Sequence, residues 1–173
     1  QGLSPLMPAS VHLVLFLYNL FMKSIVFCSS QRFSKELFEF MDKLHGLAKE
    51  KKILLTVLHP EFDRSNPDYH YKHEKDRLAD SAYRAEIAGK VYDHLFRKVK
   101  VADVCFIFNK DGYVGANVVG ELFAAAVLGK MVYALDEKTL MGHYPHDLYN
   151  EPCVQKLIHE IVQTPEELLD RLS

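Results

Sequence analysis

The chain has 173 residues, of which 49% are hydrophobic and 25% charged, and its formal net charge is -2. This length and apolar content predict one well-buried domain rather than two. Lys and Arg are spread along the chain, so neither a nucleic-acid partner nor a membrane partner is expected, and a small molecule is favoured as ligand. The three cysteines are odd in number and lack the spacing of a metal site, so they are interpreted as buried thiols in a reducing compartment, which indicates a cytoplasmic protein.

Residues 11–22 form an apolar run, VHLVLFLYNLFM, that is too short to span a bilayer, and no basic region precedes it as in a secretory signal. Two interpretations stay open. Residues 1–21 are an apolar extension upstream of a domain over 22–173, or they form a helix that packs on the body or on a second subunit.

From Lys23 onward, apolar runs typical of strands alternate with amphipathic helices. Ser34, Asn117 and Thr164 are the expected N-caps of three helices, with Pro165 at the first helical position of the last one. In chain order the predicted elements are strand 24–30, helix 34–52, strand 53–60, a polar loop over 61–73, a helix within 76–100, strand 102–108, helix 117–128, strand 130–136, a segment 154–163 that turns from helix into a short strand, and helix 164–172.

Strands that are continuous apolar runs point to a parallel sheet covered on both faces. The predicted fold class is α/β: a doubly wound, flavodoxin-like three-layer sandwich with a parallel sheet of four or five strands. In the strand order 2-1-3-4-5, ligands bind at the carboxyl ends of the first and third strands. The loops at residues 28–33 (CSSQRF) and 109–121 (NKDGYVGANVVGE) should therefore share one crevice.

The segment 109–130 holds four of the eight glycines. Gly112 and Gly115 are expected to let the chain turn sharply and bring backbone N–H groups close to a ligand, while Gly120 lets the following helix pack tightly on the sheet. With Asn117 as N-cap, the helix dipole should favour an ionised Glu121, which could act as a nucleophile. The alternative is a surface carboxylate that only complements the dipole.

The first loop supplies Ser29, Ser30 and Arg32 between a strand and a helix N-terminus, where backbone N–H groups and the guanidinium attract phosphate. Asn109, at the end of the third strand, is a candidate for binding a sugar hydroxyl, and equally a turn former. Asn117, the expected cap of the next helix, is a further candidate for binding the substrate.

Two segments carry a family resemblance: 27–44 (FCSSQRFSKELFEFMDKL) and 98–135 (KVKVADVCFIFNKDGYVGANVVGELFAAAVLGKMVYAL). They resemble the nucleoside 2-deoxyribosyltransferase-like superfamily, which includes deoxynucleoside 5'-monophosphate N-glycosidases, and look closest to members with a GYxG loop. The resemblance implies that Glu121 is the nucleophile at the anomeric carbon and that the first loop faces the sugar or its 5' substituent. It also implies a homodimer or higher homo-oligomer. The chain departs from the well-characterised transferases in having no acid between Asp111 and Glu121 to hold the base.

The reaction so implied is cleavage or transfer of the N-glycosidic bond of a (deoxy)nucleoside or its 5'-monophosphate, by retaining-glycosidase logic. His94, Asp93 and Tyr113 are candidate proton donors for the leaving base by residue type, although a helical His is often a surface or core residue. No cofactor is expected. No metal is expected either, although the segment 68–73 (DYHYKH) contains ligand-type residues.

Two other functions stay open. The sequence SSQRFS supplies a Ser-x-Arg pair similar to the phosphate loop of flavodoxin-like reductases, so a flavin-dependent oxidoreductase is one alternative. A non-catalytic nucleotide-binding module is the other, because the base-holding acid is missing.

Overall fold

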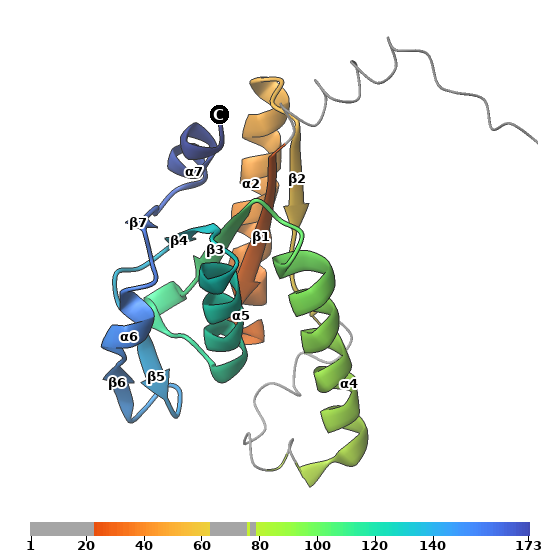
Figure 1. The fold of residues 1–173 in the computed structure, drawn as a ribbon, viewed down its shortest axis with the longest axis vertical. Helices are drawn as coiled ribbons and strands as arrows, with labels where there is room; N and C mark the ends of the chain where they lie inside the picture. The colour runs from red at the N-terminus through yellow and green to blue at the C-terminus, as the bar shows by residue number, and fades with distance from the viewer. Residues whose placement is uncertain (1–22, 63–75, 77–78) are drawn as a thin grey trace, which may run out of the picture.

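The structure is a computed structural model that describes residues 23–62, 76 and 79–173. Its centre is a five-stranded parallel sheet of order β2-β1-β3-β4-β7 (Figure 1). The strands are β1 (Lys23–Ser29), β2 (Leu55–Leu58), β3 (Val104–Phe108), β4 (Met131–Ala134) and β7 (Glu160–Ile161). The predicted doubly wound α/β sandwich is confirmed, and its strand order makes β1 and β3 neighbours at the switch point.

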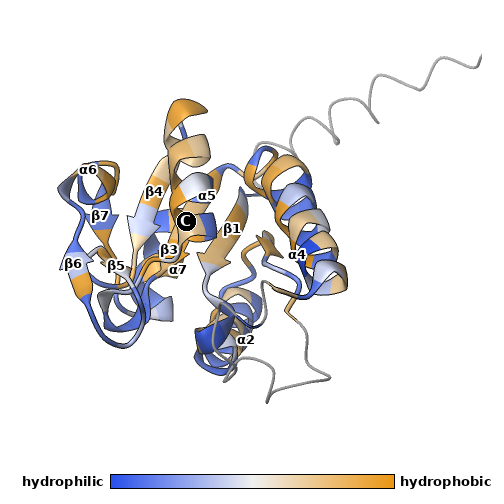
Figure 2. Ribbon diagram, turned by 90° about the horizontal axis from the view of Figure 1, so that it is seen from below, coloured by the Kyte–Doolittle hydropathy of each residue, from blue (hydrophilic) through white to orange (hydrophobic). Residues whose placement is uncertain are grey.

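Helices cover both faces of this sheet. The α-helices are α2 (Ser34–Glu50), α4 (Ser81–Asp93), α5 (Ala116–Val127), α6 (Pro152–Gln155) and α7 (Pro165–Leu172). A π-helix, His94–Val99, continues α4, and short 3₁₀ helices span Gln31–Phe33 and Lys110–Gly112. Figure 2 shows the apolar strands enclosed between these helices.

Alternate residues of each strand supply two separate cores. Phe27 and Phe106 face α2 and α7, together with leucines of both helices. Cys28 and Cys105 face the opposite layer, which contains α5 and the end of the π-helix. The period-two alternation of side chains therefore places the two strand cysteines on the same side as α5.

The helix starts differ in part from the sequence prediction. Thr164 caps α7 with a full capping box and Pro165 follows in the first turn, as predicted. Ser34 is not an N-cap, because the 3₁₀ turn before it runs directly into α2 and Phe33 takes the cap position. Asn117 is not an N-cap either, since α5 begins at Ala116 with Gly115 as its cap.

A two-stranded antiparallel hairpin, β5 (Leu140–Gly142) and β6 (Leu148–Asn150), lies beside the main sheet and was not predicted. Each strand has three residues, too few for any periodic signal. The glycine loop docks on it, because the Val114 N–H donates to the Leu140 carbonyl at 2.9 Å. The hairpin thus helps to fix the position of the loop after β3.

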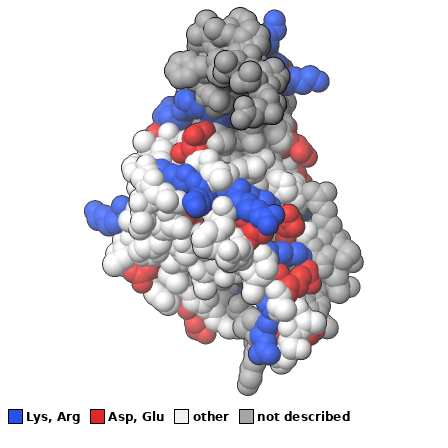
Figure 3. Space-filling model, turned by 45° about the vertical axis from the view of Figure 1, so that its right-hand side comes forward, with Lys and Arg blue, Asp and Glu red and all other residues white. Residues whose placement is uncertain are grey.

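Two predictions about whole-chain properties can be checked on the described residues. Cys28 and Cys105 are buried as predicted, but Cys153 is exposed in the first turn of α6, where the neighbouring Val154 takes the buried position instead. No helix among residues 23–62 and 79–173 is both long and apolar enough to cross a membrane. On the face shown in Figure 3, basic and acidic side chains are interspersed. Residues 1–22 lie outside the described part, so the proposed extension stays a prediction.

Candidate functional site

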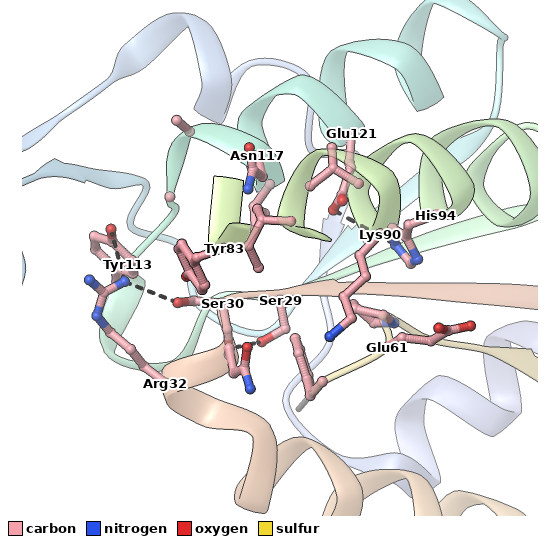
Figure 4. Close-up of a pocket in the computed structure, with 18 residues that line it drawn as sticks. Ser29, Ser30, Arg32, Glu61, Tyr83, Lys90, His94, Tyr113, Asn117 and Glu121 are labelled. Carbon is pink, nitrogen blue, oxygen red and sulfur yellow. Dashed lines mark hydrogen bonds and ion pairs between the residues drawn. The ribbon is translucent and has the colours of Figure 1, made fainter. Parts of the chain in front are cut away.

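A cavity of about 390 Å³ lies where β1, β2 and β3 end (Figure 4). The loops after these three strands, one face of α4 and the first turns of α5 form its walls. Its lining residues are Ser29, Ser30, Gln31, Arg32, Pro60, Glu61, Phe62, Tyr83, Ile87, Lys90, Val91, His94, Tyr113, Gly115, Ala116, Asn117, Val118 and Glu121. The predicted crevice shared by the first and third loops is therefore present.

Glu121 and His94 are neighbours in the lining of the cavity. His94 Nε2 lies 3.8 Å from Glu121 Oε2. Both residues are at least 95% buried. Burial raises the pKa of Glu121 to about 8, and burial together with the charge of Lys98 lowers the pKa of His94 to about 4. At neutral pH the pair is therefore mostly a protonated acid beside a neutral imidazole, not an ion pair.

The sequence-based expectation of an ionised Glu121 is wrong for the ligand-free protein. Because α5 begins at Ala116, Glu121 is the sixth residue of the helix and lies beyond its first turn. The dipole acts mainly within the first turn. Desolvation of a buried carboxylate is the larger effect here and favours the protonated form.

Cys28 completes a buried cluster with this pair. Its Sγ lies 3.6 Å from His94 Nε2 and 3.7 Å from Cys105 Sγ. Burial raises the pKa of the Cys28 thiol well above its ordinary value. Within the described part of the chain, His94 Nδ1 and Glu121 Oε2 are buried without a hydrogen-bond partner. Cys28, His94 and Glu121 each offer a ligand atom, and the three atoms lie within 4.8 Å of one another.

Arg32 and Tyr113 lie together at the other side of the pocket from Glu121 (Figure 4). Arg32 Nη1 donates to Ser30 Oγ at 3.2 Å and to the Tyr113 hydroxyl at 3.5 Å. The guanidinium also sits over the rings of Tyr113 and Tyr144, 5.3 Å from each centroid. These contacts hold the cation on the cavity wall. Ser29 is less available, because its hydroxyl donates to the Phe108 carbonyl at 3.2 Å.

The three glycines for which a role was predicted differ in their positions. Gly115 lines the cavity as the cap of α5. Gly112 does not line it. Its φ is +76°, and a Cβ there would lie 2.6 Å from the Cβ of Lys138. Glycine at this position therefore allows the loop to pack closely against the residues just before β5. The expected packing role of Gly120 is wrong, since it is exposed with nothing within 4 Å of a Cβ position.

Of the two predicted asparagines, Asn117 lines the cavity from the second position of α5. Asn109 does not. Its side chain is fully buried and donates to the carbonyls of Asp136 and Lys138 at 2.9 and 2.7 Å, while its oxygen accepts from the N–H groups of Leu135 and Asp136 at 3.0 and 2.9 Å. All four hydrogen-bonding positions of the amide are used, so Asn109 fastens β3 to the segment after β4 instead of binding a ligand.

Several lining residues were not predicted from the sequence. Tyr83, Ile87, Lys90 and Val91 lie on the α4 face that carries His94. Their spacing of four, three, one and three residues is that of one helical face and was the available signal. Asp93, a candidate proton donor, is not on this face and instead contacts Arg97 at 3.2 Å and Lys98 at 3.7 Å.

The remaining predictions concern residues or partners that nothing in the structure tests. The segment 68–73, considered as a metal tract, lies outside the described residues. The homo-oligomeric state stays a prediction.

Glu61, from the loop after β2, is a second carboxylate of the cavity lining and is paired with Lys98 at 3.3 Å.

The sequence matches none of the protein-family models and none of the curated proteins with which it was compared. Among solved structures it is similar to a conserved protein from Enterococcus faecalis V583, with 18% identity, a TM-score of 0.51, and coverage of 87% of this chain and 97% of that one. It is also similar to a 2-deoxyribosyltransferase from Bacillus psychrosaccharolyticus, with 17% identity, a TM-score of 0.45, and coverage of 84% and 89%. At such identities the likeness concerns the fold alone, and the first structure supports the α/β sandwich described above.

Proposed function

We propose that this protein cleaves or transfers the N-glycosidic bond of a (deoxy)nucleoside or its 5'-monophosphate, with Glu121 as the nucleophile. One observation carries the proposal: a buried carboxyl group faces a cavity of about 390 Å³ at the switch point between β1 and β3. Concave sites of this size are typical for small organic ligands, and the polar and charged side chains of this lining suit a polar ligand such as a nucleotide. The motif resemblance of residues 98–135 supports the same role for Glu121.

In the proposed reaction, a carboxylate oxygen of Glu121 attacks the anomeric carbon while the bond to the base breaks. The base leaves with the bonding electrons and takes up a proton. Water or a second base then attacks the same carbon and releases Glu121. Tyr113, whose hydroxyl lies beside Arg32, is the proposed proton donor on the side of the cavity away from Glu121.

Glu121 must lose its own proton before it can attack, because the free protein holds it mostly protonated. The neutral imidazole of His94 is the nearest base, with Nε2 3.8 Å away. In the free protein this transfer is unfavourable, because the pKa of His94 is about 4 and that of Glu121 about 8. Positive charge that develops on the sugar as the bond to the base stretches lowers the pKa of Glu121, so the proton passes to His94 as the attack proceeds. His94 therefore acts on the nucleophile in this proposal and not on the leaving base.

The test is release of free base from a panel of deoxynucleosides and their 5'-monophosphates, followed by chromatography. Glu121→Gln keeps the shape and removes the nucleophile, so we expect release to fall by at least about 10³-fold. Glu61→Gln is the matched control, because Glu61 is the second carboxylate of the cavity, and it should retain most of the activity. Circular dichroism checks that both variants are folded.

Undiminished base release by Glu121→Gln would refute the assignment. Ligand binding by the wild-type protein without release of base from any member of the panel would instead support the alternative of a non-catalytic nucleotide-binding module.

A further inference from the structure

The cluster of Cys28, His94 and Glu121 joins three different elements behind the cavity wall. Cys28 comes from β1, His94 is the first residue of the π-helix, and Glu121 lies in the second turn of α5. A π-turn shifts the register of the side chains that follow, and such turns are frequent at functional sites. Each of the three residues is thus positioned by a regular element rather than by a loop.

We propose that Cys28, His94 and Glu121 bind a thiophilic divalent cation, Zn²⁺ being the best fit, and that the bound ion inhibits the enzyme by engaging the nucleophile. The second half of this proposal rests on the proposed function. The first half concerns metal binding alone and stands on the geometry of the cluster.

The distances between the ligand atoms are close to those of a tetrahedral site. Cys28 Sγ to His94 Nε2 is 3.6 Å, and His94 Nε2 to Glu121 Oε2 is 3.8 Å. Around a zinc ion with Zn–S near 2.3 Å and Zn–N or Zn–O near 2.1 Å, tetrahedral ligand atoms lie about 3.3–3.6 Å apart. These two distances exceed that range by a few tenths of an ångström at most, and all three ligand atoms lie within 4.8 Å of one another, so a rotation of the Glu121 carboxyl group would bring them to one ion.

The site also contains a buried polar atom that lacks a partner. Glu121 Oε2 accepts no hydrogen bond in the described part of the chain. Buried polar atoms are normally satisfied, and an oxygen left without a partner beside a thiol and an imidazole is open to a cation. Glu121 and His94 line the cavity while Cys28 does not, so a fourth coordination position would face the cavity and take a water molecule.

The charge balance favours a divalent ion. As ligands, the three residues would be a thiolate, a neutral imidazole and a carboxylate. Binding would release one proton from the Cys28 thiol and one from the Glu121 carboxyl, leaving a thiolate, a carboxylate and M²⁺ with no net charge. A thiolate and an imidazole select zinc or cobalt over magnesium or calcium.

The experiment titrates chelator-treated, metal-free protein with Co²⁺, whose thiolate complexes absorb strongly in the near ultraviolet. We expect one equivalent to bind, Zn²⁺ to displace it, and Mg²⁺ to have no effect. Cys28→Ser should abolish the thiolate absorption, whereas Cys105→Ser should retain it. Cys105 is the matched control because it is buried and its Sγ touches Cys28 Sγ at 3.7 Å, yet it is not one of the three ligands.

No stoichiometric Co²⁺ binding, or unchanged absorption in Cys28→Ser, would overturn the metal site. Should Cys28→Ser fail to fold, the wild-type protein still provides a test, because a ligand of the folded state alone must raise its melting temperature as Zn²⁺ increases. An unchanged melting temperature would then overturn the proposal.

Inhibition is measured separately, as base release with one equivalent of Zn²⁺ and after addition of EDTA. Loss of activity that EDTA reverses supports the second half, and unaffected activity with the metal bound refutes it. Absence of base release even without metal would count against the proposed function and leave the binding result intact.

Discussion

Asn109 and Asn117 offer a direct test of which side chains hold the fold and which meet a ligand. The sequence places both in the candidate site, but the structure buries Asn109 and leaves Asn117 on the cavity wall. Asn109→Ala should therefore destabilise the protein without altering the cavity lining. Asn117→Ala should alter the lining and leave stability within about 0.5 kcal/mol, as for other exposed positions.

The magnitude for Asn109 follows from its four hydrogen bonds, with donor–acceptor distances from 2.7 to 3.0 Å. Each contributes about 0.5–1.5 kcal/mol net. The Leu135 N–H keeps a second acceptor, the Ile107 carbonyl, so part of the loss is made up. We expect the free energy of unfolding to fall by about 2–4 kcal/mol, which for a chain of this size lowers the melting temperature by roughly 5–15 °C.

Urea denaturation and thermal melting of the two variants measure this difference, and calorimetric titration with a nucleotide measures affinity. Asn109→Asp sharpens the test, because it keeps the acceptor but turns a carboxylate oxygen toward the carbonyls of Asp136 and Lys138. It should be at least as unstable as Asn109→Ala. A loss below 1 kcal/mol for Asn109→Ala would refute the structural role.

Two further predictions concern the opposite sides of the cavity. Arg32→Ala should weaken phosphorylated ligands by about 1.5–3 kcal/mol, the range for a charged hydrogen bond, and leave unphosphorylated ones nearly unchanged; equal losses for both in calorimetry would remove the phosphate role. For Glu121, the folded-state pKa of about 8 exceeds the ordinary 4.5, so its stabilising contribution is complete below pH 4.5 and is lost as pH rises toward 8. In EDTA, the free energy of unfolding of the wild-type protein should fall by on the order of 3–5 kcal/mol between pH 4.5 and pH 9 because of Glu121, and Glu121→Gln should not show this fall. Parallel pH profiles of the free energy of unfolding for the wild-type protein and the variant would contradict this burial effect.

The fold could be predicted from the sequence because its strands are continuous apolar runs, typical of a buried parallel sheet. The N-cap at Thr164 could also be predicted, because a capping box involves only residues close in sequence, here Thr164 and Glu167. The hairpin at 140–150 could not be predicted, because three-residue strands carry no period and depend on contacts with the distant loop after β3. The N-cap of α5 was misplaced by two residues. Asn117 has a side chain that is common at N-caps, but Gly115 occupies the N-cap position.

The candidate site was predicted in part. The topology of a doubly wound sheet brings residues 29–32 and the segment before Glu121 together, and the structure places them around one cavity. Burial of Glu121 could not be inferred from the sequence, because an acid near a helix start is more often exposed. The α4 wall was also missed. Its residues share one helical face, but that helix buries none of its residues and shows little amphipathic pattern, so the spacing alone did not mark the face as part of a site.

The two sides of the cavity differ in the charge that they accept. On one side Arg32 provides a fixed cation, held by Ser30 and Tyr113. On the other, Glu121 is mostly an uncharged acid at neutral pH, because desolvation by burial raises its pKa to about 8. At neutral pH that acid ionises when positive charge arrives beside it, whether as an oxocarbenium-like sugar or as a metal ion. A ligand that is anionic at one end and develops positive charge at the other therefore matches both sides, and a nucleoside 5'-monophosphate breaking its glycosidic bond has this distribution of charge.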